Sequence, residues 1–368
     1  MIYLDHAATT PVCPEARETV VRVLEGDVGN PSSGHTLGQR ARALIEEARA
    51  IVAGALGCDP AEIIFTSGGT EASGMVFGAH SRGELLVTAL EHAAVAEAAA
   101  LARGRGAKLT VVPPDAQGRV SASAVEAALT PGMALVSAML VCNETGAVLP
   151  VADIAAAVRR TGRALVHTDM AQGFLKVASE VRALGVDFAS VSGHKIGAPQ
   201  GVGALYVRRG VPLRPLLGGG GQERGLRPGT EPVALIAAFG AAVNAVMTRL
   251  LSQTEAQESL KQYALGRLPA AVPGFRFVPP HDAPHILSFA LPGVPGAVAQ
   301  RMLSDAGLCL STGSACSRGK KSRVLLAMRQ PPEVIDGALR CSFGPGNARA
   351  DIDTLAEALA AIAERVTR

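Results

Sequence analysis

The stretch DFASVSGHKIGAPQGVGALYV, residues 187–207, is the most informative about the fold of this 368-residue chain. Its two apolar runs indicate buried strands, and a turn rich in glycine and proline joins them. Lys195 lies in this turn, directly after Ser192, Gly193 and His194. A lysine at the end of a buried strand loses its water, and its amine can then form a Schiff base with a carbonyl compound. A solvated surface lysine is the ordinary alternative.

Upstream of this stretch, apolar runs alternate with helical patterns. We predict strands at 84–90, 107–113, 133–141 and 163–169, and helices at 92–104, 121–129 and 151–162. Continuous apolar strands that alternate with helices indicate a parallel sheet with helices on both faces.

Downstream, the pattern changes. The glycine-rich segment 218–232 precedes an apolar run at 233–247, which is too short to span a bilayer and indicates a buried helix. We predict a further helix at 257–271, a strand at 285–293 and an amphipathic helix at 350–366. The expected fold is α/β: a large domain at 15–250, and a smaller α+β domain formed by 251–368 with residues 1–14.

Composition indicates an ordinary soluble protein. Hydrophobic residues make up 48% of the chain. The net charge is +3, which is too small to indicate nucleic-acid binding. The start, MIYLDHAATTP, lacks the basic and apolar regions of a signal peptide, and we expect a cytoplasmic protein without a membrane anchor. The six cysteines are scattered without CxxC spacing, which predicts reduced thiols and no zinc site.

A carboxylate follows the predicted strand at 163–169. Asp169 ends that strand and Gln172 lies just beyond it. Ligands of open α/β sheets bind at the carboxyl ends of strands, although an aspartate there can also be a helix cap. Pyridoxal phosphate requires a lysine for its aldehyde and a carboxylate for its ring nitrogen, and Lys195 with Asp169 would supply both.

Three more motifs follow predicted strands. In IIFTSGGTEA, residues 63–72, Gly69 and Thr70 begin a helix, whose N-terminus either binds a phosphate or is simply capped. His92 follows the strand at 84–90, where it could stack on a pyridine ring or be a solvated helix-start histidine. Asn143 in VCNETG is either a turn residue or a polar contact to a ligand. Because all these residues are expected at one edge of the sheet, together they indicate a ligand site more specifically than any single motif does.

The segment STGSACSRGKKSR, residues 311–323, places Cys316 among small polar and basic residues. Glycine and serine give a backbone that can move. The basic residues favour the thiolate, although they would also suit a solvated basic loop. These basic residues are Arg318, Lys320, Lys321 and Arg323.

At this point the chain resembles the cysteine desulfurases, which belong to the class V aminotransferase group of fold-type I pyridoxal-phosphate enzymes. The resemblance covers residues 3–344, essentially the whole chain. Its motifs are YLDHAATTP, GNPSSGH, FTSGGTEA, EHAA, NETG, HTDMAQ, SGHKIGAPQGVG, GGGGQERGLRPGT, STGSAC and LRCSFG.

The resemblance implies a role for each matching residue. Lys195, Cys316 and His92 would be catalytic, with Lys195 holding the cofactor and Cys316 accepting sulfur. Asn143 and Arg340 would bind the substrate carboxylate, although spacing alone leaves Arg340 open as a surface charge at a strand end. Thr230 would reach the cofactor phosphate of the partner subunit, which implies a homodimer with shared active sites. The cofactor-binding set is Gly69, Thr70, His92, Asn143, Asp169, Gln172, Ser192, Gly193, His194, Lys195 and Thr230.

The implied reaction converts L-cysteine to L-alanine. Lys195 moves the α-proton, and the Cys316 thiolate takes the substrate sulfur as a persulfide that a separate acceptor or iron–sulfur scaffold protein then receives. No metal is required, although Cys316 could ligate an iron–sulfur cluster transiently. The alternatives are a selenocysteine lyase or another enzyme of the group, a non-catalytic sulfur-transfer scaffold and, far below them, a dinucleotide-binding enzyme.

Overall fold

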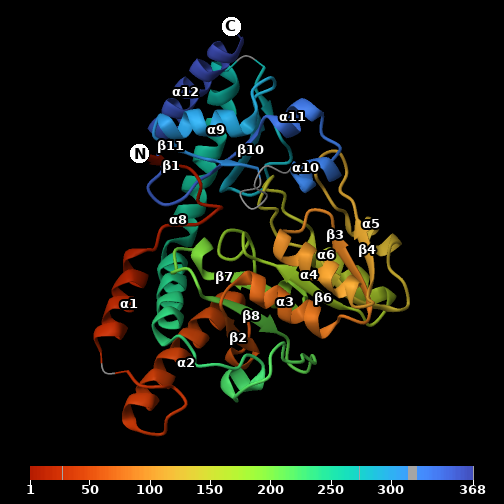
Figure 1. The fold of residues 1–368 in the computed structure, drawn as a ribbon, viewed down its shortest axis with the longest axis vertical. Helices are drawn as coiled ribbons and strands as arrows, with labels where there is room; N and C mark the ends of the chain where they lie inside the picture. The colour runs from red at the N-terminus through yellow and green to blue at the C-terminus, as the bar shows by residue number, and fades with distance from the viewer. Residues whose placement is uncertain (27, 273, 314–320, 368) are drawn as a thin grey trace.

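The central sheet of the computed structural model lies in the large lobe (Figure 1). The model describes residues 1–26, 28–272, 274–313 and 321–367. Among these, seven strands pair in the order β2-β8-β7-β6-β5-β3-β4, and β8 alone runs antiparallel to its neighbours. They are β2 (Ile63–Thr66), β3 (Glu84–Thr88), β4 (Lys108–Val112), β5 (Met133–Ser137), β6 (Leu165–Asp169), β7 (Phe188–Ser192) and β8 (Gly203–Val207).

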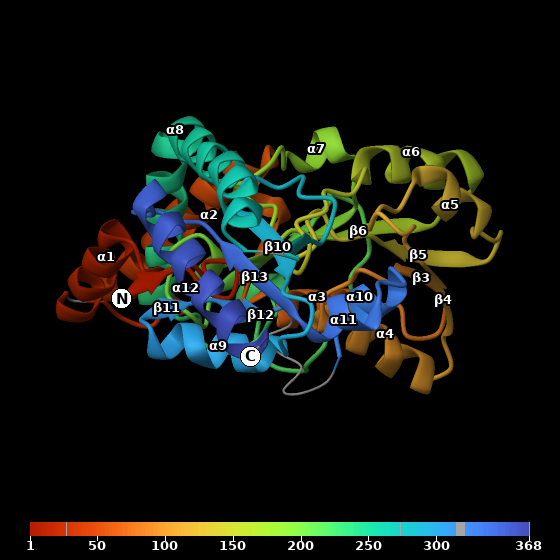
Figure 2. The ribbon, with the colours of Figure 1, turned by 90° about the horizontal axis from the view of Figure 1, so that it is seen from above.

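Helices cover both faces of this sheet, as the apolar strands predict (Figure 2). On one face α3 (Gly69–Ala79) and α4 (Ala93–Gly104) pack against each other and against the strands. On the other face lie α5 (Ala122–Ala127), α6 (Val151–Thr161) and α7 (Val181–Leu184). The predicted mostly parallel sheet, covered on both faces, is confirmed.

The smaller lobe is built around an antiparallel sheet in the order β12-β13-β10-β9. A parallel pair, β1 and β11, joins the start of the chain to this lobe. The strands are β1 (Ile2–Tyr3), β9 (Arg276–Phe277), β10 (Ile286–Ala290), β11 (Leu308–Cys309), β12 (Ser311–Thr312) and β13 (Ala338–Ser342), and the helices α9 (Gly296–Asp305), α10 (Arg323–Ala327), α11 (Pro332–Asp336) and α12 (Arg349–Thr367).

One helix, α8 (Val233–Ala271), runs through both lobes (Figure 1). It replaces the two separate helices predicted at 233–247 and 257–271, because the intervening residues 248–256 are all compatible with a helix. It packs on α1 (Pro14–Glu25), α2 (Thr36–Leu56) and α12. By length and composition α8 could cross a membrane, but 44% of its most apolar window is buried inside the protein. The domain boundary predicted near residue 250 falls inside α8 and stays a prediction.

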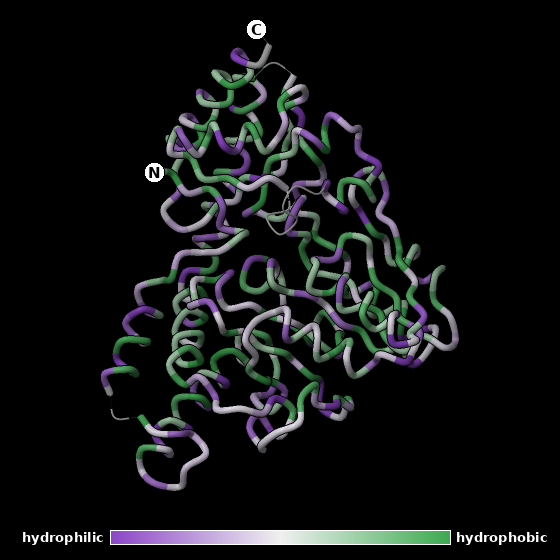
Figure 3. Tube along the Cα trace, in the orientation of Figure 1, coloured by the Kyte–Doolittle hydropathy of each residue, from purple (hydrophilic) through white to green (hydrophobic). Residues whose placement is uncertain are grey.

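One apolar cluster lies in the small lobe, and another spans both lobes. The first holds Leu4 together with residues of α8, α9, β10, β13 and α12. The second joins the large lobe to small-lobe residues such as Ile286, Val324 and Val334. Figure 3 shows hydrophobic residues running along α8, whereas the peripheral α1 alternates hydrophobic and hydrophilic positions. The first residues of the chain cross from one lobe to the other: Asp5 contacts Ser342 and Arg340 in the small lobe, and the Ala7 carbonyl accepts a hydrogen bond from Lys195 in the large lobe.

Candidate active site

The five sequence motifs meet at one edge of the central sheet. Strands β3, β5, β6 and β7 are parallel, and β2 runs in the same direction because both β2 and β7 are antiparallel to β8. Their carboxyl ends therefore share an edge. The motif residues after these ends are Gly69, Thr70, His92, Asn143, Asp169, Gln172 and Ser192–Lys195.

Lys195 lies in a short 3-10 turn (Gly193–Lys195) that directly follows β7. Its Nζ donates hydrogen bonds to the carbonyl oxygens of Ala7 and Ala8, both at 2.7 Å. Gln172 also donates to the Ala7 oxygen at 2.7 Å, while its own Oε1 is buried without a partner among the described residues. An orphaned amide oxygen beside the lysine fits a ligand with a hydroxyl group, as pyridoxal phosphate has.

Asp169 and His92 are the two residues that the sequence predicts to contact the cofactor ring, and both lie at this edge of the sheet. The buried Asp169 carboxylate accepts the Ala171 N–H at 2.9 Å. Burial raises the pKa of Asp169, and His92 and Lys195 oppose that shift. Such a carboxylate gains most from a cationic partner, and a protonated pyridine nitrogen is one. His92 caps α4 by accepting the Ala94 N–H at 3.1 Å and is partly buried, and burial lowers the pKa of His92.

The turn before α3 has the geometry of an anion cradle. Gly68 adopts φ 154°, a conformation that side chains rarely allow, and Gly69 begins the helix. A Cβ on Gly203 would lie 2.7 Å from the Gly68 Cα, so only glycine lets β8 approach this closely. Ser192 lies beside both Gly68 and Gly69. The N-terminal N–H groups of α3 thus face the end of β7, where a phosphate would be held.

Arg340 is not a surface charge. It lies within β13 and is 2% exposed. Its Nη2 donates to Asp5 and its Nη1 to the Asn143 carbonyl oxygen, both at 2.8 Å, while its Nε is buried without a partner among the described residues. Asp5 also accepts from Ser311 at 2.8 Å. The free Nε edge of a buried guanidinium is suited to a carboxylate.

Of the two remaining predicted residues, one falls outside the described structure and the other is exposed. Cys316 falls in 314–320, outside the described residues. Two described residues close to this stretch, Gly313 and Ser322, both approach Glu144: Ser322 donates to the Glu144 carboxylate, and a Cβ on Gly313 would lie 3.4 Å from it. Thr230 is exposed, at the end of the glycine-rich segment.

The segment that carries Thr230 is tied to the anion cradle. Arg227 pairs with Glu71 at 2.9 Å, and Glu71 accepts the Ser67 N–H at 2.6 Å. Nearby, the buried Arg49–Glu223 pair at 2.7 Å holds the turn before it. These ion pairs hold the backbone of the segment that carries Thr230, which lies at the protein surface.

Sequence reasoning missed three polar residues of this region. Asp5 balances Arg340, Glu91 lies buried beside His92, and Lys176 lies four residues beyond Gln172. A signal existed only for Lys176, because a lysine inside the apolar run GFLKV is unusual for a surface turn.

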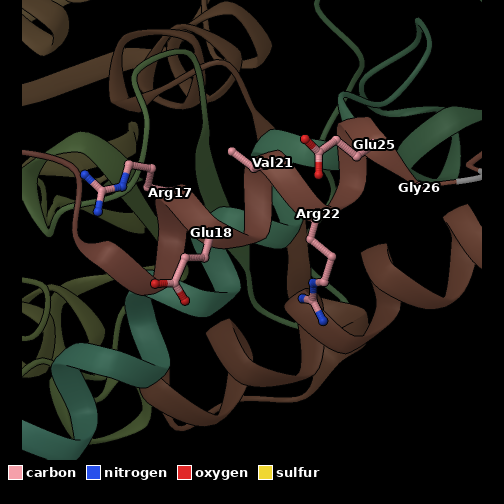
Figure 4. Close-up of a pocket in the computed structure, with 6 residues that line it drawn as sticks. All are labelled: Arg17, Glu18, Val21, Arg22, Glu25 and Gly26. Atoms are coloured by element: carbon pink, nitrogen blue, oxygen red, sulfur yellow. The ribbon is translucent and has the colours of Figure 1, made fainter.

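Two surface hollows lie elsewhere and include none of the predicted residues. One, of about 470 Å³, lies along α1 (Figure 4) and is lined by Arg17, Glu18, Val21, Arg22, Glu25 and Gly26. The other, of about 620 Å³, lies between α1 and α8. Their mixed charges and distance from the strand ends give them no part in the chemistry considered below.

Comparison with known proteins agrees with this geometry. The aminotransferase class-V model matches residues 2–355. A cysteine desulfurase of Cereibacter sphaeroides is 39% identical over 382 residues, covering 99% of this chain and 96% of that protein. A solved NifS-like protein superposes with a TM-score of 0.93 at 33% identity and 99% coverage of both chains. A structure titled SspA in complex with cysteine has a TM-score of 0.83 at 30% identity, covering 95% of this chain and 100% of that one. The chain belongs to the aminotransferase class-V family.

Proposed function

We infer that this protein is a pyridoxal-phosphate-dependent cysteine desulfurase. The observation that carries the inference is the meeting of Lys195, Asp169 and the orphaned Gln172 oxygen at one strand edge, opposite the buried free edge of Arg340. The first three fit the cofactor, and Arg340 fits an amino-acid carboxylate. The named relatives support cysteine as that amino acid.

Different residues of this chain have different roles in the reaction. The cofactor supplies an aldehyde and an electron-accepting ring. Lys195 carries a proton to and from the amino-acid carbon, because its amine lies at the strand edge beside the ring site. Arg340 orients the substrate through its carboxylate. The Cys316 thiolate forms a new S–S bond to the substrate sulfur as the carbon–sulfur bond breaks, and a proton takes the place of sulfur on carbon, which yields alanine.

The direct test is incubation of the holoenzyme with L-cysteine and a reductant. With the reductant we expect alanine and sulfide in equal amounts, and no sulfide from Cys316→Ala. Without the reductant we expect one extra sulfur atom on Cys316 by mass spectrometry. Full activity of Cys316→Ala would exclude the persulfide route. Borohydride should fix the cofactor covalently to Lys195, and failure to do so would exclude the cofactor assignment. 3-Mercaptopyruvate in place of alanine, without sulfide, would indicate an aminotransferase, and turnover of selenocysteine alone a selenocysteine lyase.

We propose that the active protein is a homodimer in which Thr230 of each subunit completes the phosphate site of the other. In support, Thr230 is exposed, and its segment also exposes Leu216 and Leu217, at 45% and 65%. Mixing Lys195→Ala with Thr230→Ala chains should restore activity, because one site of the mixed dimer then has both residues intact. Inactive mixtures that do contain mixed dimers would overturn this proposal.

The acceptor of the persulfide sulfur is proposed to be a separate protein of iron–sulfur assembly or of thiolation, in the cytoplasm. The five described cysteines are free, which suits a reducing compartment. Transfer of labelled sulfur from Cys316 to a purified scaffold protein would test the acceptor, and no transfer to any thiol-bearing scaffold would count against it.

A further inference from the structure

One face of helix α3 continues from the anion cradle into the protein core. Gly69, Ser73 and Phe77 are four residues apart, so they lie in a row along this helix. Gly69 begins the row beside β7, where a Cβ on Gly69 would lie 3.7 Å from the Ser192 Cβ. Ser73 and Phe77 follow it and are both buried. The row therefore joins the cradle to the packing of α3 on the sheet.

Ser73 and Phe77 both contact polar residues of the strands. Ser73 Oγ donates a hydrogen bond to Ser190 Oγ of β7 at 3.1 Å. The Phe77 ring meets the His167 ring of β6 edge to face, with 5.9 Å between their centroids. Ser190 lies two residues before Ser192, and so on the same face of β7. One strand thus contacts both the cradle and the next turn of α3.

His167 extends this contact into a hydrogen-bonded chain across three neighbouring strands. Its Nε2 lies 2.8 Å from Ser190 Oγ, and its Nδ1 lies 2.8 Å from Ser137 Oγ of β5. Ser73, Ser137, His167 and Ser190 are each 0% exposed, so water does not compete for these bonds. These four residues are called the buried polar chain below.

The protons of the buried polar chain have one consistent arrangement. Ser190 accepts from Ser73, and a buried hydroxyl normally donates its own proton too, so Ser190 donates to His167 Nε2. The His167 proton then lies on Nδ1 and is donated to Ser137. Burial lowers the pKa of His167 to about 3, which agrees with a neutral ring that accepts at one nitrogen.

Small residues make up nearly half of α3, and they interlock little with the sheet. They are Gly69, Ala72, Gly74, Gly78 and Ala79. Apolar contacts have no preferred direction, so they hold such a helix weakly along its own axis. A shift by one residue would move the first N–H groups by about 1.5 Å, which a hydrogen bond to a phosphate does not tolerate. A directed chain of hydrogen bonds prevents this shift.

We propose that the buried polar chain positions α3 for the cofactor phosphate, with His167 as a positioning residue that acts through Ser190 and Ser73. This inference rests on the proposed function and adds positioning residues to its cofactor site. The chain holds the helix whose first N–H groups bind the phosphate. Lys195 and Asp169 hold the ring end of the cofactor, so loss of the chain weakens recognition of the phosphate more than recognition of the ring.

The test compares pyridoxal phosphate with pyridoxal, which lacks the phosphate, as ligands of the full-length protein freed of its cofactor. The phosphate preference is the Kd for pyridoxal divided by the Kd for pyridoxal phosphate. Ser73→Ala should lower this preference about threefold to tenfold, the size expected for one buried hydrogen bond. The Kd for pyridoxal itself should stay within about twofold of the wild type.

Two substitutions at His167 test its part in the chain. His167→Leu removes the acceptor for Ser190 and should lower the phosphate preference as Ser73→Ala does. His167→Gln has a side-chain oxygen that can accept from Ser190, and it should retain more of the preference than His167→Leu. Because both positions act through one chain, Ser73→Ala combined with His167→Leu should lose little more preference than the larger single loss.

His80, at the other end of α3, provides the matched control. Its Nδ1 lies 2.8 Å from the Val76 carbonyl oxygen, and its ring packs edge to face on Phe188 at 5.8 Å. His80→Phe should keep the phosphate preference of the wild type. Nitrogen NMR of the holoenzyme should also show His167 neutral with its proton on Nδ1. A proton on Nε2 would overturn the proposal, because Ser190 would then have no acceptor for its own proton.

The remaining outcomes separate this proposal from the proposed function. An unchanged phosphate preference in Ser73→Ala and His167→Leu would overturn the positioning role. Equal weakening of both ligands, or fully additive losses in the double variant, would also overturn it. A preference that depends on the buried polar chain, in a wild-type protein that releases no sulfide from cysteine, would instead overturn the proposed function alone.

Discussion

At the residue scale, Glu91 is a buried carboxyl group next to His92. Its Oε1 accepts hydrogen bonds from Thr88 Oγ1 and from the Met139 N–H, both at 2.8 Å, and its Oε2 is buried without a partner in the described part of the chain. Burial raises the pKa of Glu91 to about 8, and Asp169 adds to the shift. Glu91 is therefore protonated in the folded protein at neutral pH.

This protonation makes stability depend on pH. An unfolded glutamate loses its proton near pH 4.5, the folded Glu91 only near 8. Its contribution to the free energy of unfolding is thus complete below about pH 4.5 and is lost, by up to about 1.4 kcal/mol per unit, as the pH rises to 8. The glutamine in Glu91→Gln cannot ionise, so the melting temperature of this variant minus that of the wild type should increase from pH 5.5 to pH 8.

The control is Glu25→Gln, at an exposed position of α1. Its melting temperature should follow the wild type across the same pH range. A constant difference between Glu91→Gln and the wild type from pH 5.5 to 8 would contradict a neutral buried Glu91.

Arg340 shows where residue-level prediction ends. Spacing could not decide between a ligand-binding arginine and a surface charge, because the deciding partner, Asp5, lies 335 residues away in sequence. The strand-end motifs were predictable because each follows an apolar run, and the parallel order of the strands then brings them together.

At the element scale, the contact between α2 and α8 depends on a single glycine. A Cβ on Gly240 would lie 2.9 Å from both the Cα and the Cβ of Ala48. Gly54 also lies in a helix, on α2, yet a Cβ there would meet nothing within 4 Å. The same substitution at the two glycines should therefore have opposite effects.

Gly240→Ala should lower the free energy of unfolding by about 1–3 kcal/mol, because the two helices must separate or the alanine must strain. Gly54→Ala should raise it by up to about 1 kcal/mol, since alanine favours the helix more than glycine does. Urea unfolding of both variants measures the difference. Equal changes at the two positions would show that the α2–α8 contact does not limit stability.

The sequence predicted the helices and strands more accurately than the residues at which they end. The strand expected at 133–141 stops at Ser137, although Ala138 and Leu140 still donate to the carbonyls of His167 and Asp169. The chain there turns back on itself, with Leu149 donating to Leu140, toward the Asn143 turn. An apolar run predicts that residues are buried, not that they form a strand. Here the buried residues continue beyond the end of the strand and into the site.

At the scale of the whole molecule, Lys261 of α8 holds the two lobes together. Its side chain is 4% exposed, and its Nζ donates to the carbonyls of His281, Asp282 and Ala283 at 3.0–3.4 Å. That small-lobe segment reaches the large lobe through a hydrogen bond from the Ala283 N–H to the Gly146 carbonyl at 2.8 Å.

Lys261→Met should leave three carbonyl acceptors, one buried and two partly buried, without their partner and lower the free energy of unfolding by about 1–3 kcal/mol. Hydrogen exchange should also accelerate at the amide of Ala283 and across 146–148. Arg301→Met, at an exposed pair with Asp305, is the control and should change stability by less than about 0.5 kcal/mol. Unchanged exchange at 146–148 in Lys261→Met would show that the lobes are joined by other contacts.

The change of pattern along the sequence predicts two domains, and their boundary stays a prediction, but that change does not predict how the two lobes are connected. Alternating strands and helices gave way to an α+β pattern near residue 250. That α8 crosses this point without a break depends on its packing against α1, α2 and α12, which no local pattern encodes.

The continuity of α8 has a mechanical consequence. A helix of 39 residues is about 58 Å long at 1.5 Å per residue, and it has one end in each lobe. Any hinge motion must therefore bend this rod, and a bend of about 5° at its middle swings the far end by about 2–3 Å. Small curvature of α8 would thus become a large change in the separation of the two lobes.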